Sequence, residues 1–129
     1  MNLYTILKED SLLNEFKEKI IPRVHKIQNY IDEYRFDSST LPEKEITLKY
    51  LLEELDLLNI DFKNIGYDYT PEVVPDVDED TFISSLEKYK EDLSHMLNNF
   101  NEDYFESYST QIRYFINLID IHRANLINT

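Results

Sequence analysis

The chain of 129 residues has a formal net charge of −13, with 26 acidic residues against 13 basic ones, and apolar residues make up 42% of it. This length and apolar content suit one compact domain with a hydrophobic core, which argues against extensive disorder. The acidity argues against direct binding to nucleic acid or to an anionic membrane, because phosphate groups are bound by basic surfaces.

The first predicted element is a long amphipathic helix. Apolar residues recur every three or four positions in the first quarter of the chain, which predicts a helix over about residues 11–35. Asp10 or Ser11 is suited to cap its start. Pro22 lacks a backbone N–H, so we expect a kink near this residue or two abutting helices. Residues 3–9 either extend the helix or form an irregular arm.

The second predicted helix, over residues 42–65, is marked at both ends. The segment from Thr40 to Glu43 has the spacing of a capping box, and Pro42 falls in the first turn, where its missing N–H costs little. A leucine-rich face follows with helical spacing. Gly66 comes directly after this face, where a left-handed residue often ends a helix.

The segment 67–80 breaks the helical pattern. Pro71 and Pro75 forbid a continuous helix, and the segment contains six acidic residues and no basic one. We therefore predict an irregular acidic loop. A third helix is predicted over residues 81–99, with Asp80 as its cap.

The last helix is predicted over residues 103–127, after a turn at 98–101, although one helix running through that turn is the alternative. Amphipathic helices of this length bury their apolar faces against one another. The sequence therefore predicts a single all-α domain over residues 1–129, an antiparallel four-helix bundle. Short connections pair the first helix with the second and the third with the fourth, whereas the segment 67–80 is long enough to cross the bundle.

The negative charge is concentrated in one part of the chain. Residues 66–106 contain 12 acidic residues and only Lys88 and Lys90 as bases, a net charge of −10. One interpretation is a solvated face whose carboxylates also favour helix N-termini. The other is a docking face for a basic partner, in which carboxylates steer association and tyrosines anchor it. The predicted partner-binding residues are Tyr67, Asp68, Tyr69, Glu72, Asp76, Asp78, Glu79, Asp80, Glu87 and Glu91.

The same segment has the acid spacing of a calcium loop. Asp76, Asp78 and Asp80 stand at its first, third and fifth positions and Glu87 at its twelfth, so these 12 residues resemble an EF-hand loop. The resemblance implies that the four carboxylates ligate Ca²⁺. Thr81, however, replaces the glycine of the sharp turn, and the preceding prolines deny the loop its incoming helix. An acidic helix start that matches by chance is the alternative, and we expect no metal site.

No pattern of catalytic residues is evident. The motif from Asp92 to His95 places a carboxylate and an imidazole one helical turn apart, but the second such motif that di-iron bundles need is missing. His95 is expected at the surface, and His122 beside the apolar face of the last helix. Nucleophile-elbow, zinc-protease and phosphate-loop motifs do not occur. We therefore expect neither an enzyme nor a cofactor.

Two functions from different classes fit these features. The first is a small acidic inhibitor or immunity-type protein that neutralises a basic nuclease or nucleic-acid-binding protein, as DNA mimics and phage anti-defence proteins do. The alternative is a structural or adaptor bundle held in a larger assembly by an apolar face, and a calcium-binding module is the third candidate.

The sequence has no cysteine, no signal-like N-terminus and no membrane-spanning run. We therefore expect a cytoplasmic protein, of unknown oligomeric state.

Overall fold

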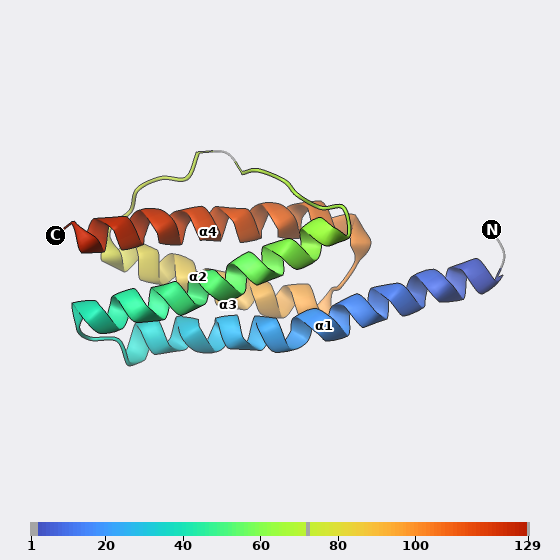
Figure 1. The fold of residues 1–129 in the computed structure, drawn as a ribbon, viewed down its shortest axis with the longest axis horizontal. Helices are drawn as coiled ribbons and strands as arrows, with labels where there is room; N and C mark the ends of the chain where they lie inside the picture. The colour runs from blue at the N-terminus through green and yellow to red at the C-terminus, as the bar shows by residue number, and fades with distance from the viewer. Residues whose placement is uncertain (1–2, 72, 129) are drawn as a thin grey trace.

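The computed structural model describes residues 3–71 and 73–128, with side chains from Ser11 onward. The described residues form helices and contain no strand, which confirms the predicted all-α class (Figure 1). None of these helices has the length and apolar character that crossing a bilayer requires. The elements in chain order are α1 (Leu3–Phe36), α2 (Leu41–Asn64), α3 (Glu79–Asn98), the 3₁₀ helix η1 (Glu102–Tyr104) and α4 (Phe105–Ile127).

Helix α1 is longer than the predicted range 11–35 because residues 3–9 extend it, which was one of the two alternatives for that segment. It begins at Leu3, so Asp10 and Ser11 lie inside it and do not cap its start, which corrects that prediction. Pro22 also lies inside α1, which remains one helix and excludes two abutting ones. The axis bends part-way along the blue part of the ribbon in Figure 1, as a proline within a helix favours. Ile20 and Val24, on either side of the proline, are fully buried, so both parts of α1 pack on the core.

The N-termini of α2 and α3 are capped by side chains. Thr40 and Glu43 form the predicted capping box, in which each side chain accepts a hydrogen bond from the backbone of the other. Helix α3 is capped by Asp78, whose carboxylate accepts from the Thr81 N–H at 2.8 Å. The prediction of Asp80 as the cap was therefore wrong by two residues. Both residues offer the required carboxylate, so the sequence alone did not choose between them.

Gly66 ends α2 as predicted. Its φ of +102° lies in the region that favours glycine. The Gly66 N–H donates to the Lys63 carbonyl at 3.0 Å and the Tyr67 N–H to the Phe62 carbonyl at 2.9 Å. This pair of bonds is a Schellman motif, which satisfies carbonyls at the end of the helix and turns the chain away from its axis.

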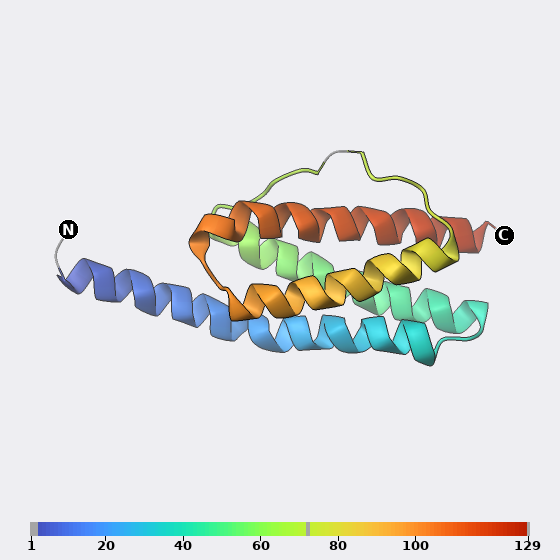
Figure 2. The same ribbon diagram turned by 180° about the vertical axis from the view of Figure 1, so that it is seen from behind.

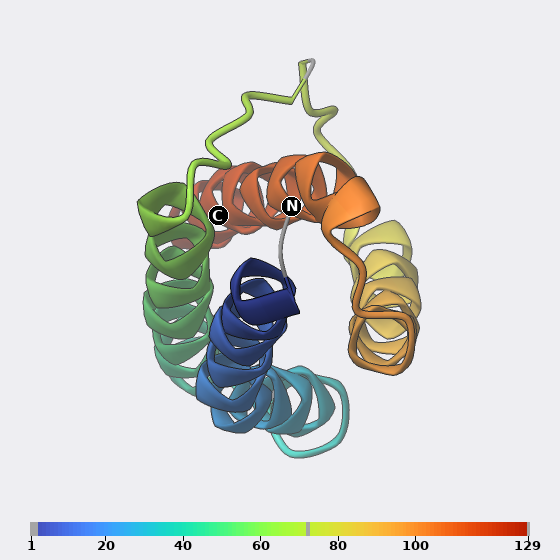
Figure 3. The ribbon, with the colours of Figure 1, turned by 90° about the vertical axis from the view of Figure 1, so that its right-hand side faces the viewer.

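The four helices surround one core in the order α1, α2, α4, α3 (Figure 3). Figures 1 and 2 show α1 antiparallel to α2 and α3 antiparallel to α4, with the segment between α2 and α3 running back along α4. We call this segment, residues 65–78, the crossover. It makes α3 start at the end of the bundle opposite to the end of α2. The structure is thus an antiparallel four-helix bundle with one long crossover connection.

The predicted apolar faces form the core, with few exceptions. Ile65, predicted as the last core residue of the second helix, is the C-cap of α2 and is 42% exposed. Leu13, Leu97 and Tyr108 are only half-buried. Val74 of the crossover is buried against the bundle, so this segment contributes to the core. The largest fully buried side chains include Tyr34, Tyr89, Phe62, Phe82 and Phe105.

Candidate functional site

The crossover divides the predicted docking residues between the two ends of the bundle. Tyr67, Asp68 and Tyr69 follow the end of α2, whereas Asp76, Asp78, Glu79 and Asp80 lie where α3 starts (Figures 1 and 2). Glu87 and Glu91 lie further along α3. Glu72 lies outside the described residues. The sequence placed most of these residues on one loop, and Glu87 and Glu91 on the helix after it, but the loop spans the bundle, so they do not form one compact patch.

At the α2 end of the crossover, the backbone is fixed by a buried serine. The Ser109 hydroxyl donates to the Tyr67 carbonyl at 3.1 Å and accepts from the Tyr69 N–H at 3.3 Å. The Tyr67 ring packs edge-on against Phe105 at 5.4 Å, and its hydroxyl donates to Glu102 at 3.3 Å. Tyr67 is therefore half-buried at the edge of the core, while Tyr69, 37% exposed, is the more accessible of the two tyrosines.

The carboxylates around the start of α3 have separate structural partners. Asp76 accepts from the Asn125 amide at 2.6 Å and so holds the crossover to α4. Asp78 is the α3 cap, and the hydrogen bonds from Thr81 lower the pKa of its carboxyl. Asp80, in contrast, is exposed and has no partner among the described residues.

These contacts do not assemble the calcium loop. Asp76 and Asp78 bind Asn125 and the α3 backbone, and Glu87 forms a 2.8 Å ion pair with Arg35 of α1. Among the described side chains, those of residues 11–71 and 73–128, no group of three or more His, Asp or Glu is arranged to hold a metal ion. The acid spacing instead results from a capped helix start, because Asp78 caps α3 and Asp80, the fifth position of the proposed loop, is already helical.

Glu79 connects α3 to the other three helices. Its two carboxylate oxygens accept from the Tyr34 hydroxyl of α1 at 2.8 and 3.1 Å. Lys44 of α2 lies 3.3 Å from Oε1, and the His122 Nε2 of α4 lies 2.5 Å from Oε2. Partial burial raises the pKa of Glu79, but the three hydrogen bonds outweigh it and lower the pKa below its ordinary value. Glu79 was predicted to bind a partner, but these contacts give it a structural role.

His122 lies where the sequence placed it, beside the apolar face of α4. It is 5% exposed, and its ring stacks on Phe82 at 3.9 Å. The Phe82 ring in turn packs edge-on against Tyr34. The sequence indicated each of these residues separately, but only the packing of the four helices brings them to Glu79.

On the outer face of α3, one of the two lysines contacts α1. Lys90 forms a 2.6 Å ion pair with Asp32, so one of the two lysines in the acidic segment is neutralised within the chain. Lys88 and Glu91 are exposed and have no partner among the described residues. Glu91 is therefore available to a partner as predicted, whereas Glu87 is held by Arg35.

A second acidic area lies between α2 and α4. Burial first, and then the charge of Asp120, raise the pKa of Asp56, while Arg113 acts to lower it. Burial likewise raises the pKa of Asp120, against the opposing effect of Arg123. Both carboxylates lie outside the acidic segment 66–106, and they are 64 residues apart in the chain. The sequence therefore did not suggest that they lie close together.

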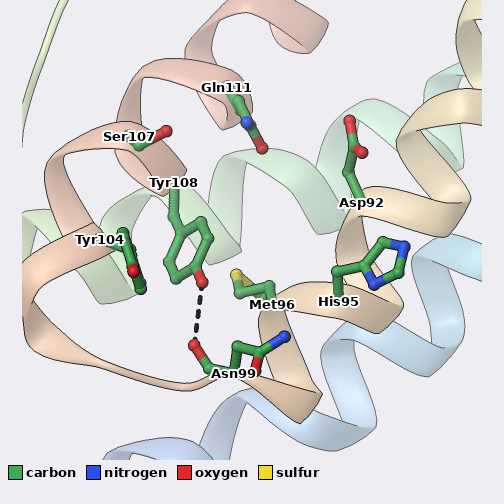
Figure 4. A pocket seen from close by; sticks show the side chains of 8 residues that line it. All are labelled: Asp92, His95, Met96, Asn99, Tyr104, Ser107, Tyr108 and Gln111. Carbon is green, nitrogen blue, oxygen red and sulfur yellow. Dashed lines mark hydrogen bonds between the residues drawn. The ribbon is translucent and has the colours of Figure 1, made fainter.

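A cleft lies between the C-terminal part of α3 and the start of α4 (Figure 4). Its volume is about 330 Å³. The Tyr108 hydroxyl donates to the Asn99 carbonyl at 3.0 Å across the α3–α4 turn. No hydrogen bond joins Asp92, His95 and Ser107 to one another in this part of the described structure, so they do not form a nucleophile–base pair. The lining residues are Asp92, His95, Met96, Asn99, Tyr104, Ser107, Tyr108 and Gln111.

The sequence indicated the Asp92–His95 motif. It did not indicate that this motif faces one cleft with Tyr104 and Tyr108, because the turn between α3 and α4 sets their relative positions. Comparison with known proteins gives no further guide: no family model, curated protein or solved structure matches the chain.

Proposed function

We propose that this protein binds a basic protein partner without catalysis and neutralises it, as an inhibitor or immunity-type protein would. The observation that carries the proposal is that most basic side chains are paired within the fold, whereas many acidic side chains among the described residues are not. Most basic side chains form ion pairs with acids of the same chain, so little positive charge is left to offset the exposed carboxylates. The paired bases are Lys19, Arg23, Lys26, Arg35, Lys44, Lys63, Lys90 and Arg123.

Four of the exposed carboxylates that remain free lie on α3, η1 and the start of α4. Asp80, Glu91, Asp103 and Glu106 are exposed, and their carboxylates have no partner among the described residues. Such groups raise the local concentration of a cationic partner and speed its association. Tyr104, 53% exposed among them, supplies the kind of aromatic side chain that anchors interfaces.

The partner class follows from this charge. Carboxylates on a helical surface can occupy the basic surface that a nuclease or nucleic-acid-binding protein uses for phosphates. The proposal therefore includes DNA mimicry and phage anti-defence activity as its specific forms. It places the protein in the cytoplasm, a reducing compartment that suits a chain without cysteine.

The test is recovery of a basic partner followed by measurement of its association rate. The protein is immobilised in cell extract, and we expect a basic protein that is released by salt and displaced by duplex DNA. Neutralising four free carboxylates, in the variant D80N/E91Q/D103N/E106Q, should slow its association about tenfold or more at low salt.

The matched control neutralises four exposed carboxylates on α1, α2 and the turn between them, in the variant E15Q/E18Q/D37N/E53Q. It changes the net charge equally and should leave the association rate within about threefold. Equal slowing by both variants would show that only net charge matters, and no effect of either would refute the docking surface. Recovery of neutral or acidic proteins alone would contradict the proposed partner class.

One observation favours the adaptor function as a second candidate. Helix α1 continues past the ends of the other helices (Figures 1 and 2), and beside it lies a groove of about 220 Å³. Leu12 and Ile65 on its rim are 56% and 42% exposed. Exposed apolar side chains around a groove are typical of an interface.

Light scattering on purified protein separates the two functions. A neutralising protein should be monomeric at micromolar concentration, whereas an adaptor should self-associate through this groove. In the adaptor case, Leu12→Asp should return the protein to a monomer, and Leu57→Asp, at a 43% exposed position on α2 outside the groove, should not. A monomeric wild-type protein would contradict self-assembly by the bundle.

A further inference from the structure

The cleft of Figure 4 lies at the most open seam of the bundle. Helix α4 packs chiefly on α2 and α3 chiefly on α1, so α3 and α4 contact each other at fewer points. Stacking of Tyr89 on Phe115 at 3.8 Å closes the middle of this seam, and the cleft lies beyond it, toward the α3–α4 turn. Its volume of about 330 Å³ is large enough for the end of a long side chain.

The walls of the cleft combine aromatic rings with one carboxylate. Figure 4 shows Tyr104 and Tyr108 on one side, Asp92 on the other, and Met96 between them. The two tyrosine rings are 6.3 Å apart, and the Tyr108 ring is held by its hydrogen bond to Asn99. Aromatic faces beside a carboxylate are an arrangement that attracts an organic cation.

The charge of Asp92 is not balanced within the chain. Its carboxylate has no ion pair or hydrogen bond among the described residues, and no described Lys or Arg lines the cleft. Asp92 is the one acidic residue among the residues that line the cleft. Burial, and then the charge of Asp92, raise the pKa of the nearby Tyr89 phenol, whose buried hydroxyl also has no hydrogen-bond partner. A cation in the cleft would supply the missing opposite charge.

We propose that the cleft between α3 and α4 receives the guanidinium group of an arginine side chain on the basic partner. A planar guanidinium can stack on Tyr104 or Tyr108 while it donates two hydrogen bonds to Asp92, whereas an ammonium lacks both the plane and the paired donors. Gln111, which extends into the space between Tyr108 and Asp92 in Figure 4, offers a further acceptor. This inference rests on the proposed function for the source of the arginine.

The binding of arginine can be tested without the partner. The probe is the blocked tripeptide Gly-Arg-Gly, titrated into labelled protein and followed by the NMR shifts of backbone amides at constant ionic strength. The comparison peptides replace arginine with citrulline, which has the same shape without the charge, and with lysine. We expect saturable shifts around Asp92, Tyr104 and Gln111 with the arginine peptide, and binding about tenfold weaker or more with the other two.

The variants D92N and Y104A should each weaken the binding of the arginine peptide about tenfold, because each removes one of the two attractive groups. The control E53Q removes an exposed carboxylate of α2 that does not line the cleft and should leave binding unchanged. Absence of saturable shifts, equal binding of the citrulline or lysine peptide, or an unchanged affinity of D92N would overturn the assignment.

The same variants separate this inference from the proposed function. If a basic partner binds D92N and Y104A as tightly as the wild-type protein, the arginine site is wrong and the basic partner stands. If the arginine peptide occupies the cleft but no basic protein is recovered from extract, the site stands and the proposed function fails.

Discussion

Replacing Phe105 with alanine is expected to lower the free energy of unfolding by about 4 kcal/mol. Phe105 is 1% exposed, and its ring lies 4.9–5.8 Å from the rings of Phe16, Phe62, Tyr67 and Phe100. These neighbours come from α1, α2, the crossover and the α3–α4 turn. Because four separate segments surround the ring, the cavity left by its removal cannot be filled by a shift of one of them. Urea unfolding followed by circular dichroism measures the loss.

The neighbouring residue provides the control. Tyr104 is 53% exposed, so Tyr104→Ala should change the free energy of unfolding by less than about 1 kcal/mol. The same measurement establishes that the Y104A variant used to test the cleft is folded. A loss of less than about 2 kcal/mol for Phe105→Ala would contradict the central position of this ring.

The variant Glu79→Ala is expected to destabilise the fold by about 3 kcal/mol, the second-largest effect. It removes the acceptor of the Tyr34 hydroxyl and of His122, two side chains that are 2% and 5% exposed. The Tyr34 hydroxyl and the His122 Nε2 would then lose the one hydrogen-bond partner that each has in the described structure, while both side chains stay largely buried. Urea unfolding at neutral pH gives the loss.

Asp80→Ala is the matched control, because it removes the next carboxylate along α3. Asp80 is exposed and unpartnered in the described structure, so only its favourable effect on the helix N-terminus is lost, about 0.5 kcal/mol. If both variants cost the same, the contacts of Glu79 contribute nothing beyond the charge at the start of the helix.

The pKa of Glu79 also predicts how stability depends on pH. Because this pKa is lowered in the folded protein from its ordinary value of 4.5, the folded state favours the carboxylate. Its contribution is complete above pH 4.5 and is lost as the pH falls through the lowered value. In Glu79→Gln this component is absent, so the variant should lose less stability than the wild-type protein on acidification. Urea unfolding between about pH 3 and 7 measures the two slopes, and parallel slopes would contradict the lowered pKa.

Several local features were predictable because they depend on neighbours in sequence. The capping box of Thr40 and Glu43 and the left-handed Gly66 were predicted correctly, since each is set within a few residues. Where neighbouring residues offer the same chemistry, the prediction failed, as it did for Asp80 in place of Asp78 as the cap. The start of α1 was also missed, because a suitable cap at Ser11 does not prevent the helix from continuing through it.

The candidate sites were predicted less well than the helices. The tyrosines and carboxylates of the cleft were visible in sequence, but their common location depends on the angle at which the chain turns between α3 and α4. The three residues that contact Glu79 are each 35 to 45 positions away from it along the chain, and no local pattern relates them to it. Local spacing carries no information about contacts of this kind.

The sequence by itself determined the helical class, the approximate helices and the excess of acid, because helical periodicity and charge are properties of neighbouring residues. Only the tertiary structure decided which acids face outward. It placed Glu79 among Tyr34, Lys44 and His122, paired Glu87 with Arg35, and left Glu91 free. The physical reason is that a carboxylate is neutralised by whatever base the packing of other helices brings within reach, and the order and direction of the helices set that base.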